Sequence, residues 1–317
     1  MEKTNLQSTE EKTKSKCKII KSILLKISVA LFIVTTILIS FGKPLGIPDW
    51  NEVFTFCGLY ADMGDDLSAS FVDVGSADAC VISCHGKNIL IDSGTKLSYD
   101  KLYVYLKRNK ISHFDALIIS HPDSDHIGGA SDIIKDFKVN KVYTSRIDKS
   151  LIPKTDDCKR FYNSIKEYKV KLIYPEIKSK INIGDMELEF ISPQKSYNNT
   201  NDSSLVVRLV YGENSFLFTG DISDDVELDL LNSDTELKSD VLKVAHHGSK
   251  GSSTEDFLKA VKPQISVVSV GYSDNSLPDY TTMADINHYS KELYRTDKDK
   301  TIVITSDGKD LCVQTNA

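Results

Sequence analysis

Side chains that commonly ligate metals are concentrated in one short stretch of this 317-residue sequence. Four of them fall within six positions: His121, Asp123, Asp125 and His126. Carboxylates a few ångströms apart repel each other unless a cation neutralises them, so the motif points to a metal site. It follows the apolar run 116–120, and loops at the carboxyl end of a strand often carry functional residues. A solvated polar turn that also caps a helix is the alternative interpretation.

Two further motifs place the same residue types after apolar runs. Asp221 follows the run 216–220, where a carboxylate can bridge two metal ions or cap the next helix. His246 and His247 follow the run 241–245, in a chain with only seven histidines. Three isolated histidines are instead predicted to be surface or capping residues: His85, His113 and His288.

The remaining apolar runs predict two sets of strands with helices between them. The strands are expected at 70–74, 79–84, 88–93, 116–120, 142–145, 171–175, 186–192, 205–211, 216–220, 241–245 and 265–270. The helices are expected at 98–109, 127–137, 157–168, 224–232 and 254–261. Asp307-Gly308 predicts a C-terminal hairpin turn. Together these elements predict an α/β (α+β) domain of about 250 residues, with two packed sheets flanked by helices.

Charge and cysteine content argue against several classes of protein. Residues 1–26 hold seven Lys and three Glu, a balance of +4, so the total of −6 leaves −10 for residues 27–317. Such an acidic body is a poor non-specific binder of polyphosphate, because affinity for nucleic acid comes largely from neutralised phosphates; a local basic groove is the alternative. The absence of C-x-x-C, P-loop and G-x-S-x-G motifs argues against zinc ribbons, nucleotide cofactors and serine catalysis. Two of the six cysteines, Cys80 and Cys84, are expected to be buried on one face of a strand.

The N-terminal segment is typical of a membrane anchor. Residues 27–41 contain no charge, and the apolar-rich sequence extends back to residue 19, about the length that spans a bilayer. The lysines precede it, and positive flanks stay in the cytoplasm. A cleaved signal peptide and a buried helix are the alternatives. The expected organisation is a cytoplasmic tail (1–18), a transmembrane anchor (19–42), a linker (43–66) and an extracytoplasmic domain (67–317).

Four motifs in a fixed order resemble a known family. They are D-x-G from Asp92, H-x-D-x-D-H-x-G-G from His121, T-G-D ending at Asp221, and H-H-G-S from His246. This order is similar to that of the metallo-β-lactamase-fold hydrolases and, more narrowly, of the hydrolase domain of ComEC-type competence proteins. The resemblance covers nearly all of residues 68–310. It implies an αββα sandwich that binds two divalent metal ions, zinc or manganese.

The resemblance also implies which residues bind metal. His121 and Asp123 would bind one ion. Asp125, His126 and His246 would bind the second. Counting Asp221, which the resemblance places between the ions, the second set has two imidazoles and two carboxylates and suits zinc, whereas the oxygen-rich first set suits Mn²⁺ or Mg²⁺. We therefore expect the first ion to be held more weakly.

Other roles follow from the same resemblance. Asp221 would bridge both ions, and Asp92 would support the metal-binding loop. His247 would contact the substrate or support a ligand. The residues expected to be catalytic are Asp125, Asp221 and His247.

The sequence departs from the general family pattern at three places. Asp123 stands where the broad family has His, although Asp is usual in the ComEC branch. No His lies between residues 127 and 245, so the third-motif His is replaced by a polar residue: Asn201, Asp202 or Ser204. Leu277 precedes Pro278 where a family segment has His, so we expect a slower reaction or a different substrate.

These features favour a metal-dependent hydrolase. A metal pair about 3.5–4 Å apart holds a hydroxide beside the substrate and neutralises charge on a phosphoryl or carbonyl oxygen. We expect phosphodiester substrates, either nucleic acid or an envelope polymer. The alternatives are an ester, lactone or amide hydrolase and a non-catalytic, metal-retaining binding module. The sequence predicts no oligomeric state, and one candidate spanning segment does not support DNA transport.

Overall fold

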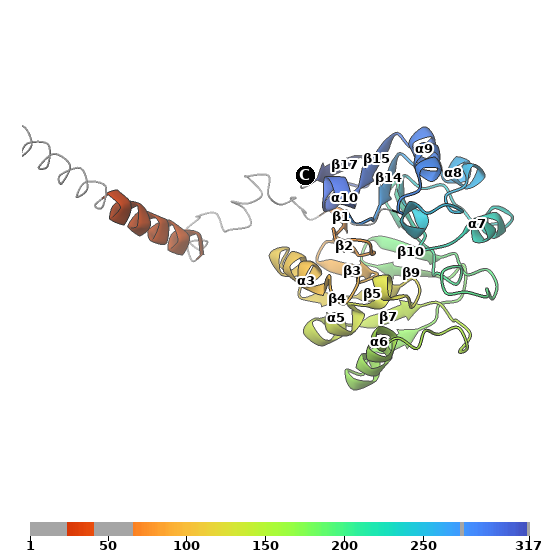
Figure 1. Ribbon diagram of the computed structural model, residues 1–317, viewed down its shortest axis with the longest axis horizontal. Helices are drawn as coiled ribbons and strands as arrows, with labels where there is room; N and C mark the ends of the chain where they lie inside the picture. Colours follow the sequence, from red (N-terminus) through yellow and green to blue (C-terminus); the bar gives the residue numbers. More distant parts are fainter. Residues whose placement is uncertain (1–23, 41–65, 273–275, 316–317) are drawn as a thin grey trace, which may run out of the picture. The chain divides into compact units, whose positions relative to one another are not determined.

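The computed structural model describes residues 24–40, 66–272 and 276–315 (Figure 1). The chain divides into two units, residues 1–60 and 61–317. The predicted tail over 1–18 and the predicted linker up to residue 65 lie outside the described residues.

One helix, over residues 24–40, is described in the first unit. The hydroxyls of Ser28, Thr35 and Thr36 donate hydrogen bonds to backbone carbonyls four residues earlier, which satisfies these polar groups within the helix. Within the described ranges, no helix has the length and apolar character needed to cross a membrane. The transmembrane helix predicted over 19–42 is therefore not supported.

Two mixed β-sheets form the centre of the second unit. The strands of the first are β1 (Leu67–Phe71), β2 (Cys80–Cys84), β3 (Lys87–Ile91), β5 (Ala116–Ile119), β7 (Lys141–Thr144), β8 (Lys171–Ile173), β16 (Ile302–Ser306) and β17 (Leu311–Thr315). Their order is β17-β16-β1-β2-β3-β5-β7-β8. The strands of the second are β9 (Lys180–Ile183), β10 (Met186–Phe190), β11 (Val207–Tyr211), β12 (Asn214–Phe218), β13 (Val241–Lys243), β14 (Ile265–Val268) and β15 (Glu292–Arg295). Their order is β15-β14-β13-β12-β11-β10-β9, and a short pair joins β4 (His113–Phe114) to β6 (Lys138–Val139).

Helices cover both sheets (Figure 1). They are α3 (Tyr99–Arg108), α4 (Ser124–Ile127), α5 (Ala130–Asp136), α6 (Asp156–Glu167), α7 (Asp224–Leu231), α8 (Glu255–Val261), α9 (Tyr280–Tyr289) and α10 (Thr296–Asp299). A 3-10 turn, η2, spans Ala245–Gly248. One buried apolar cluster packs α3 to α6 on the first sheet, another packs α7 to α9 on the second, and a third lies between the sheets. The predicted layers, helix-sheet-sheet-helix, are confirmed.

Local sequence explains most element boundaries. The side chain of Thr155 accepts the Cys158 N–H at the start of α6, and Asp279 accepts two N–H groups at the start of α9. The helix predicted over 127–137 begins later, at Ala130 of α5, and the short helix α4 before it ends at Ile127, next to Gly128. A Cβ at that glycine would lie 2.6 Å from the Lys96 nitrogen, so only glycine fits this close backbone approach. Helix α9 was not predicted, because its apolar residues show no clear helical period.

The parallel parts of the two sheets position the functional loops. In the first sheet β3, β5, β7 and β8 run parallel, and in the second β12, β13, β14 and β15 do. Parallel strands end at the same edge of a sheet, so residues that follow different strands lie side by side. The central strands are buried on both faces, which explains their nearly continuous apolar runs.

Candidate metal centre

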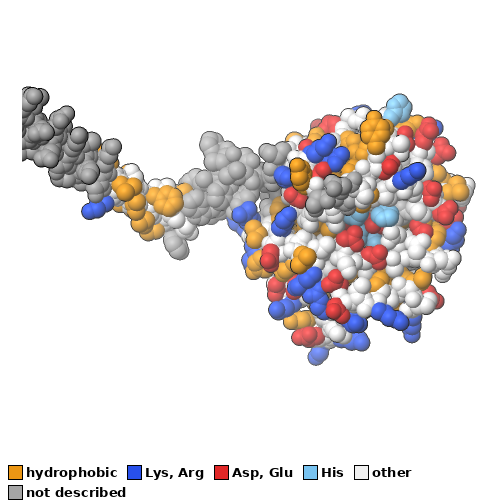
Figure 2. Space-filling model, viewed as in Figure 1, with side chains coloured by type: hydrophobic (Ala, Val, Ile, Leu, Met, Phe, Trp, Pro, Cys, Tyr) orange, Lys and Arg blue, Asp and Glu red, His pale blue; other side chains and the backbone are white. Residues whose placement is uncertain are grey.

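Loops after β5, β12 and β13 bring the predicted metal ligands together. The Asp221 carboxylate lies at the centre of the group. Its Oδ2 is 3.3 Å from His126 Nε2, and 3.9 Å from the Nε2 atoms of both His121 and His246. Figure 2 shows histidine side chains beside acidic ones near the middle of the visible face of the domain. Residues separated by more than a hundred positions therefore meet at one place, as predicted.

One set of ligand-type side chains is compact. Asp125, His126, Asp221 and His247 each offer one atom, and the four atoms lie within 4.8 Å of one another. His247 Nε2 is 3.3 Å from Asp125 Oδ2 and 3.7 Å from Asp221 Oδ2. The histidines and Asp221 are buried, whereas Asp125 on α4 is partly exposed. Two imidazoles and two carboxylates form a donor set that zinc accepts.

The second set is more open and shares Asp221 with the first. His121 Nε2 lies 3.8 Å from Asp123 Oδ2 and 3.9 Å from Asp221 Oδ2. In the part of the chain that the structure describes, these three do not converge as closely as the compact set. Asn201 and His246 border the group, with Asn201 Nδ2 3.5 Å from His246 Nε2. This looser geometry agrees with weaker binding of the ion at His121 and Asp123, which stays a prediction.

The two adjacent histidines differ in burial and in their neighbours. His246 was expected among the ligands, and His247 was expected to contact the substrate or support a ligand. Instead, His247 joins the compact set and is 3% exposed, while the His246 side chain is 38% exposed beside it. Both residues have positive φ angles, 48° and 53°, which no periodicity rule anticipates. Strained backbone of this kind clusters at functional sites, where the surrounding structure holds it in place.

A hydrogen-bond network behind the site orients two of the rings. Asp92 Oδ2 accepts a hydrogen bond of 2.9 Å from His126 Nδ1, so His126 Nε2 is left to face Asp221. Asp92 also accepts the backbone N–H and hydroxyl of Ser120, and Ser120 lies 3.0 Å from His121 Nδ1. Carboxylates that hold metal-ligating imidazoles in this way fix the tautomer and raise ligand basicity. These contacts agree with the supporting role expected for Asp92.

Two charged residues that sequence reasoning missed lie directly behind the compact set. Lys243 Nζ is 2.7 Å from Asp78 Oδ2, and both side chains are about 95% buried. Asp78 Oδ1 lies 3.6 Å from His247 Nδ1, which donates to the Ser269 carbonyl at 2.8 Å. The sequence did hold one signal for this pair: Lys243 is a charged residue inside an apolar strand, and such a residue needs a buried partner.

The three residues considered as replacements for the third-motif histidine lie at different distances from the site. Asn201 borders the site, whereas Asp202 accepts the Ser223 N–H and an Asn199 amide away from it. Ser204 supports the ligands, since its Oγ accepts the Asp221 N–H and lies 3.3 Å from His121 Nδ1.

Leu277 occupies the position where the family segment has His. Its side chain packs against the apolar cluster beneath α7 to α9. The neighbouring Pro278 lies against Gly248 of the histidine loop, since a Cβ on that glycine would be 2.8 Å from it. Leu277 thus adds no titratable group to the segment that lies against the histidine loop.

Comparison with known proteins identifies the family. The model of the metallo-beta-lactamase superfamily matches residues 72–272, which is more than half of the chain. The chain belongs to the metallo-beta-lactamase superfamily. Solved superfamily structures share this fold, including the metallo-beta-lactamase fold protein YhfI from Bacillus subtilis. That protein aligns with a TM-score of 0.50 at 13% identity, over 78% of this chain and 100% of its own.

Curated relatives of the chain are competence and recombination proteins. ComE operon protein 3 of Bacillus subtilis is 28% identical over 77% of this chain and 34% of its own length. Recombination protein 2 of Haemophilus influenzae is 29% identical over 71% of this chain and 27% of its own length. The chain therefore spans about a third of the length of these relatives. The predicted resemblance to ComEC-type competence proteins is confirmed.

The buried carboxylates and imidazoles of the site shift one another's pKa values. Burial opposes a charge on His126, but Asp221 and Asp92 outweigh burial and raise its pKa well above the usual value. Burial is likewise outweighed at His247, where Asp221 and Asp78 raise the pKa to about 9. At Asp221 burial is outweighed by His126 and His247, which hold the pKa of the carboxyl well below its usual range. The carboxylates thus attract protons to the imidazoles wherever no other cation is bound.

The same group fits a pair of divalent cations. Three buried atoms at its centre have no hydrogen-bond partner: His121 Nε2, His126 Nε2 and Asp221 Oδ1. Leaving such atoms unpaired costs about 1–3 kcal/mol each, so a bound cation would recover this energy. Five carboxylates (residues 78, 92, 123, 125 and 221) against the Lys243 ammonium leave four formal negative charges, which two divalent ions would neutralise.

Proposed function

We propose that the second unit is a metal-dependent hydrolase that cleaves phosphodiesters. The observation that carries the proposal is the sharing of Asp221 by two ligand sets with buried, unpartnered donor atoms. A pair of divalent cations at such sites supplies an activated water and neutralises charge that develops on the scissile group. The membership of the metallo-beta-lactamase superfamily supports the hydrolase class.

The protein residues then divide into those that hold the cations and those that face the substrate. We assign His121 and Asp123 to one cation, and Asp125, His126 and His247 to the other, with Asp221 between them. Asp92, Ser120 and Ser204 keep the rings and the shared carboxylate in position, which preserves the spacing on which catalysis depends.

His246 takes the role of substrate contact in this proposal. Its side chain is 38% exposed beside Asp221, and the Asn201 amide lies next to its Nε2. Both groups can form hydrogen bonds to a phosphoryl oxygen that approaches from solvent. We therefore assign His246, in place of His247, to substrate binding.

Phosphodiesters are favoured over other substrates by the oxygen-rich set around Asp123 and by the relatives. A site that holds Mn²⁺ or Mg²⁺ through carboxylates suits phosphoryl transfer. The names of the relatives concern competence and recombination, which makes nucleic acid one candidate substrate. The acidic body, −10 over residues 27–317, favours a substrate that does not require a broad basic surface.

The test is a substrate panel with full-length protein, first stripped of metal and then supplied with Mn²⁺ or Zn²⁺. We expect turnover of bis-p-nitrophenyl phosphate or DNA only after metal is restored. Asp221→Asn should reduce the rate at least 100-fold, because the shared ligand loses its charge. Asp225→Asn, an exposed neighbour on α7, is the matched control and should retain full activity.

Other outcomes would reassign the substrate or remove the enzyme assignment. Lactone, ester or amide hydrolysis without phosphodiester hydrolysis would favour another bond on the same site. Metal binding that depends on Asp221, without turnover of any substrate in the panel, would favour the non-catalytic binding module. Two observations keep this module as the second candidate. The general family pattern has histidines at two places where this chain has the amide Asn201 and the apolar Leu277.

The position of the domain relative to a membrane is a separate prediction that rests on the sequence alone. The charge-free stretch 27–41 after a lysine-rich segment favours membrane attachment with an extracytoplasmic domain. Extraction of membranes with carbonate, followed by immunoblotting, tests it: the protein should stay in the membrane pellet, and full release into the wash would contradict it.

A further inference from the structure

A second group of ligand-type side chains lies outside the candidate metal centre. Cys84, His85 and Asp185 each offer one ligand atom, and the three atoms lie within 4.8 Å of one another. His85 Nδ1 is 3.6 Å from Cys84 Sγ and 2.9 Å from Asp185 Oδ2. The proposed hydrolase uses none of these residues, so the group needs its own explanation.

Two hairpin turns, one from each sheet, bring these three residues together. His85 and Gly86 form the two-residue turn between β2 and β3, with positive φ angles of 45° and 74°, as a type I′ turn requires. Gly184 and Asp185 form the turn between β9 and β10. The turns touch, because a Cβ on Gly184 would lie 3.1 Å from the side chain of Lys87.

This group is remote from the hydrolase site. The turn that holds His85 precedes β3, whereas Asp92 of the candidate metal centre follows the same strand. Five residues of extended chain separate them by roughly 17 Å. Each site can therefore be tested by substitutions that leave the other intact.

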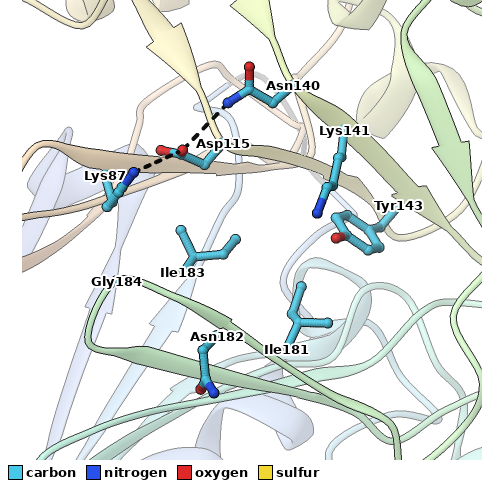
Figure 3. Close-up of a pocket in the computed structure, with 9 residues that line it drawn as sticks. All are labelled: Lys87, Asp115, Asn140, Lys141, Tyr143, Ile181, Asn182, Ile183 and Gly184. Atoms are coloured by element: carbon cyan, nitrogen blue, oxygen red, sulfur yellow. Dashed lines mark hydrogen bonds and ion pairs between the residues drawn. The ribbon is translucent and has the colours of Figure 1, made fainter.

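The surroundings of Cys84 favour a cation. Burial raises the pKa of the Cys84 thiol, a hydrogen bond with Tyr211 lowers it, and the carboxylates of Asp185 and Asp66 raise it again, so two negative charges act on the sulfur. The nearby ammonium of Lys87 is directed elsewhere, to Asp115 at 3.5 Å. Figure 3 shows this pair at the edge of an adjoining pocket of about 240 Å³, with Gly184 at the neighbouring turn.

We propose that Cys84, His85 and Asp185 bind a zinc-class metal ion that joins the turns of the two sheets. A thiolate, an imidazole and a carboxylate are typical zinc ligands, and Mn²⁺ and Mg²⁺ bind thiolates poorly. Metal–ligand bonds of roughly 2.0–2.3 Å place tetrahedral ligand atoms roughly 3.3–3.8 Å apart. The Cys84–His85 distance of 3.6 Å lies in this range, and the hydrogen-bonded His85–Asp185 distance of 2.9 Å would lengthen on binding. The fourth position is left to water.

Proton balance follows from the ligand chemistry. The Cys84 thiol loses its proton to solvent on binding, because only the thiolate is a ligand. The neutral His85 ring changes tautomer on binding: the proton that Nδ1 donates to Asp185 leaves Nδ1, and one returns from solvent to Nε2, so that Nδ1 offers its lone pair to the metal. Binding should therefore strengthen as the pH rises. This inference is independent of the proposed hydrolase activity.

Cobalt titration of reduced, metal-stripped, full-length protein tests the proposal. A thiolate bound to Co²⁺ gives a near-ultraviolet charge-transfer band, and none of the residues assigned to the hydrolase site is a cysteine. We expect one equivalent of this band, displaced by Zn²⁺. The band should disappear in Cys84→Ser, and Zn²⁺ affinity at this site should fall at least tenfold in His85→Ala and in Asp185→Asn.

Two controls separate this site from others. Cys80→Ser alters a buried thiol at the far end of the same strand and should leave the band unchanged. Asp221→Asn should abolish hydrolysis and also leave the band unchanged, so failure of one proposal does not decide the other. Absence of the band in wild-type protein, its persistence in Cys84→Ser, or full Zn²⁺ affinity in the exposed Asp185→Asn variant would overturn the site. The group would then be a surface ion pair beside a buried thiol.

Discussion

At the scale of single residues, the site depends on carboxylates that face several imidazoles at once. Asp221 Oδ2 lies within 3.9 Å of four histidine Nε2 atoms. Asp92 supports one of these rings from behind and anchors the loop through Ser120. Each carboxylate therefore contacts other residues that we assign as ligands, so substitution of either one should change metal affinity.

Asp92→Asn tests the support of His126. The amide keeps the size of the side chain but offers the His126 Nδ1–H a weaker, neutral acceptor. We expect metal affinity at the compact set to fall about 10–100-fold, because such supporting contacts typically have this effect. Equilibrium dialysis with metal analysis measures it, with circular dichroism as the check on folding. Unchanged affinity would show that the contact does not support a ligand.

Metal affinity should also depend on pH in a defined direction. Without metal, the pKa of His247 is about 9 and that of His126 is raised as well, so both rings hold protons at neutral pH. A metal must displace those protons, so affinity increases as the pH rises toward 9. We expect the Kd for Mn²⁺ to fall at least tenfold between pH 6 and pH 8. Calorimetry in two buffers with different ionisation enthalpies should show proton release, and equal Kd values at both pH values would contradict the assigned ligands.

At the scale of elements, β13 links the fold to the site. Its last residue, Lys243, pairs with Asp78 in the loop between β1 and β2 of the first sheet, and the histidine pair begins three residues later. The Lys243 ammonium also donates to the Val244 carbonyl at 2.8 Å. One buried ion pair thus connects the two sheets directly behind His247.

Lys243→Met tests this connection. The variant leaves Asp78 buried without its cation, so we expect the free energy of unfolding to fall by about 3–5 kcal/mol in urea denaturation. The double variant with Asp78→Asn should regain part of this loss, because the uncompensated charge is gone. Lys238→Met, at an exposed position, is the control and should change stability by less than about 0.5 kcal/mol. A single variant as stable as wild type would show that the pair does not stabilise the fold.

At the scale of the whole molecule, the sequence predicted the two sheets better than the details of the site. Apolar runs are local signals, and the residues after them could be placed at strand ends without any knowledge of their partners. Which of His246 and His247 lies in the compact set could not be read from the sequence, because it depends on two consecutive residues with positive φ.

Other features depend on contacts between distant parts of the chain. The pairing of Asp78 with Lys243 joins two sheets, and the approach of His85 to Asp185 joins turns 100 positions apart. No local pattern contains that information. His85, expected to be an isolated surface or capping residue, therefore belongs to a group that became recognisable only in the folded chain.

The central claim is that two cations share Asp221, and Mn²⁺ titration followed by electron paramagnetic resonance tests it most directly. Two Mn²⁺ ions about 3.5–4 Å apart through a common carboxylate are magnetically coupled. Metal-stripped wild-type protein should show isolated Mn²⁺ at the first equivalent and a coupled signal at the second. Asp221→Asn should show no coupled signal. Two equivalents bound by wild-type protein as isolated ions would contradict the shared site.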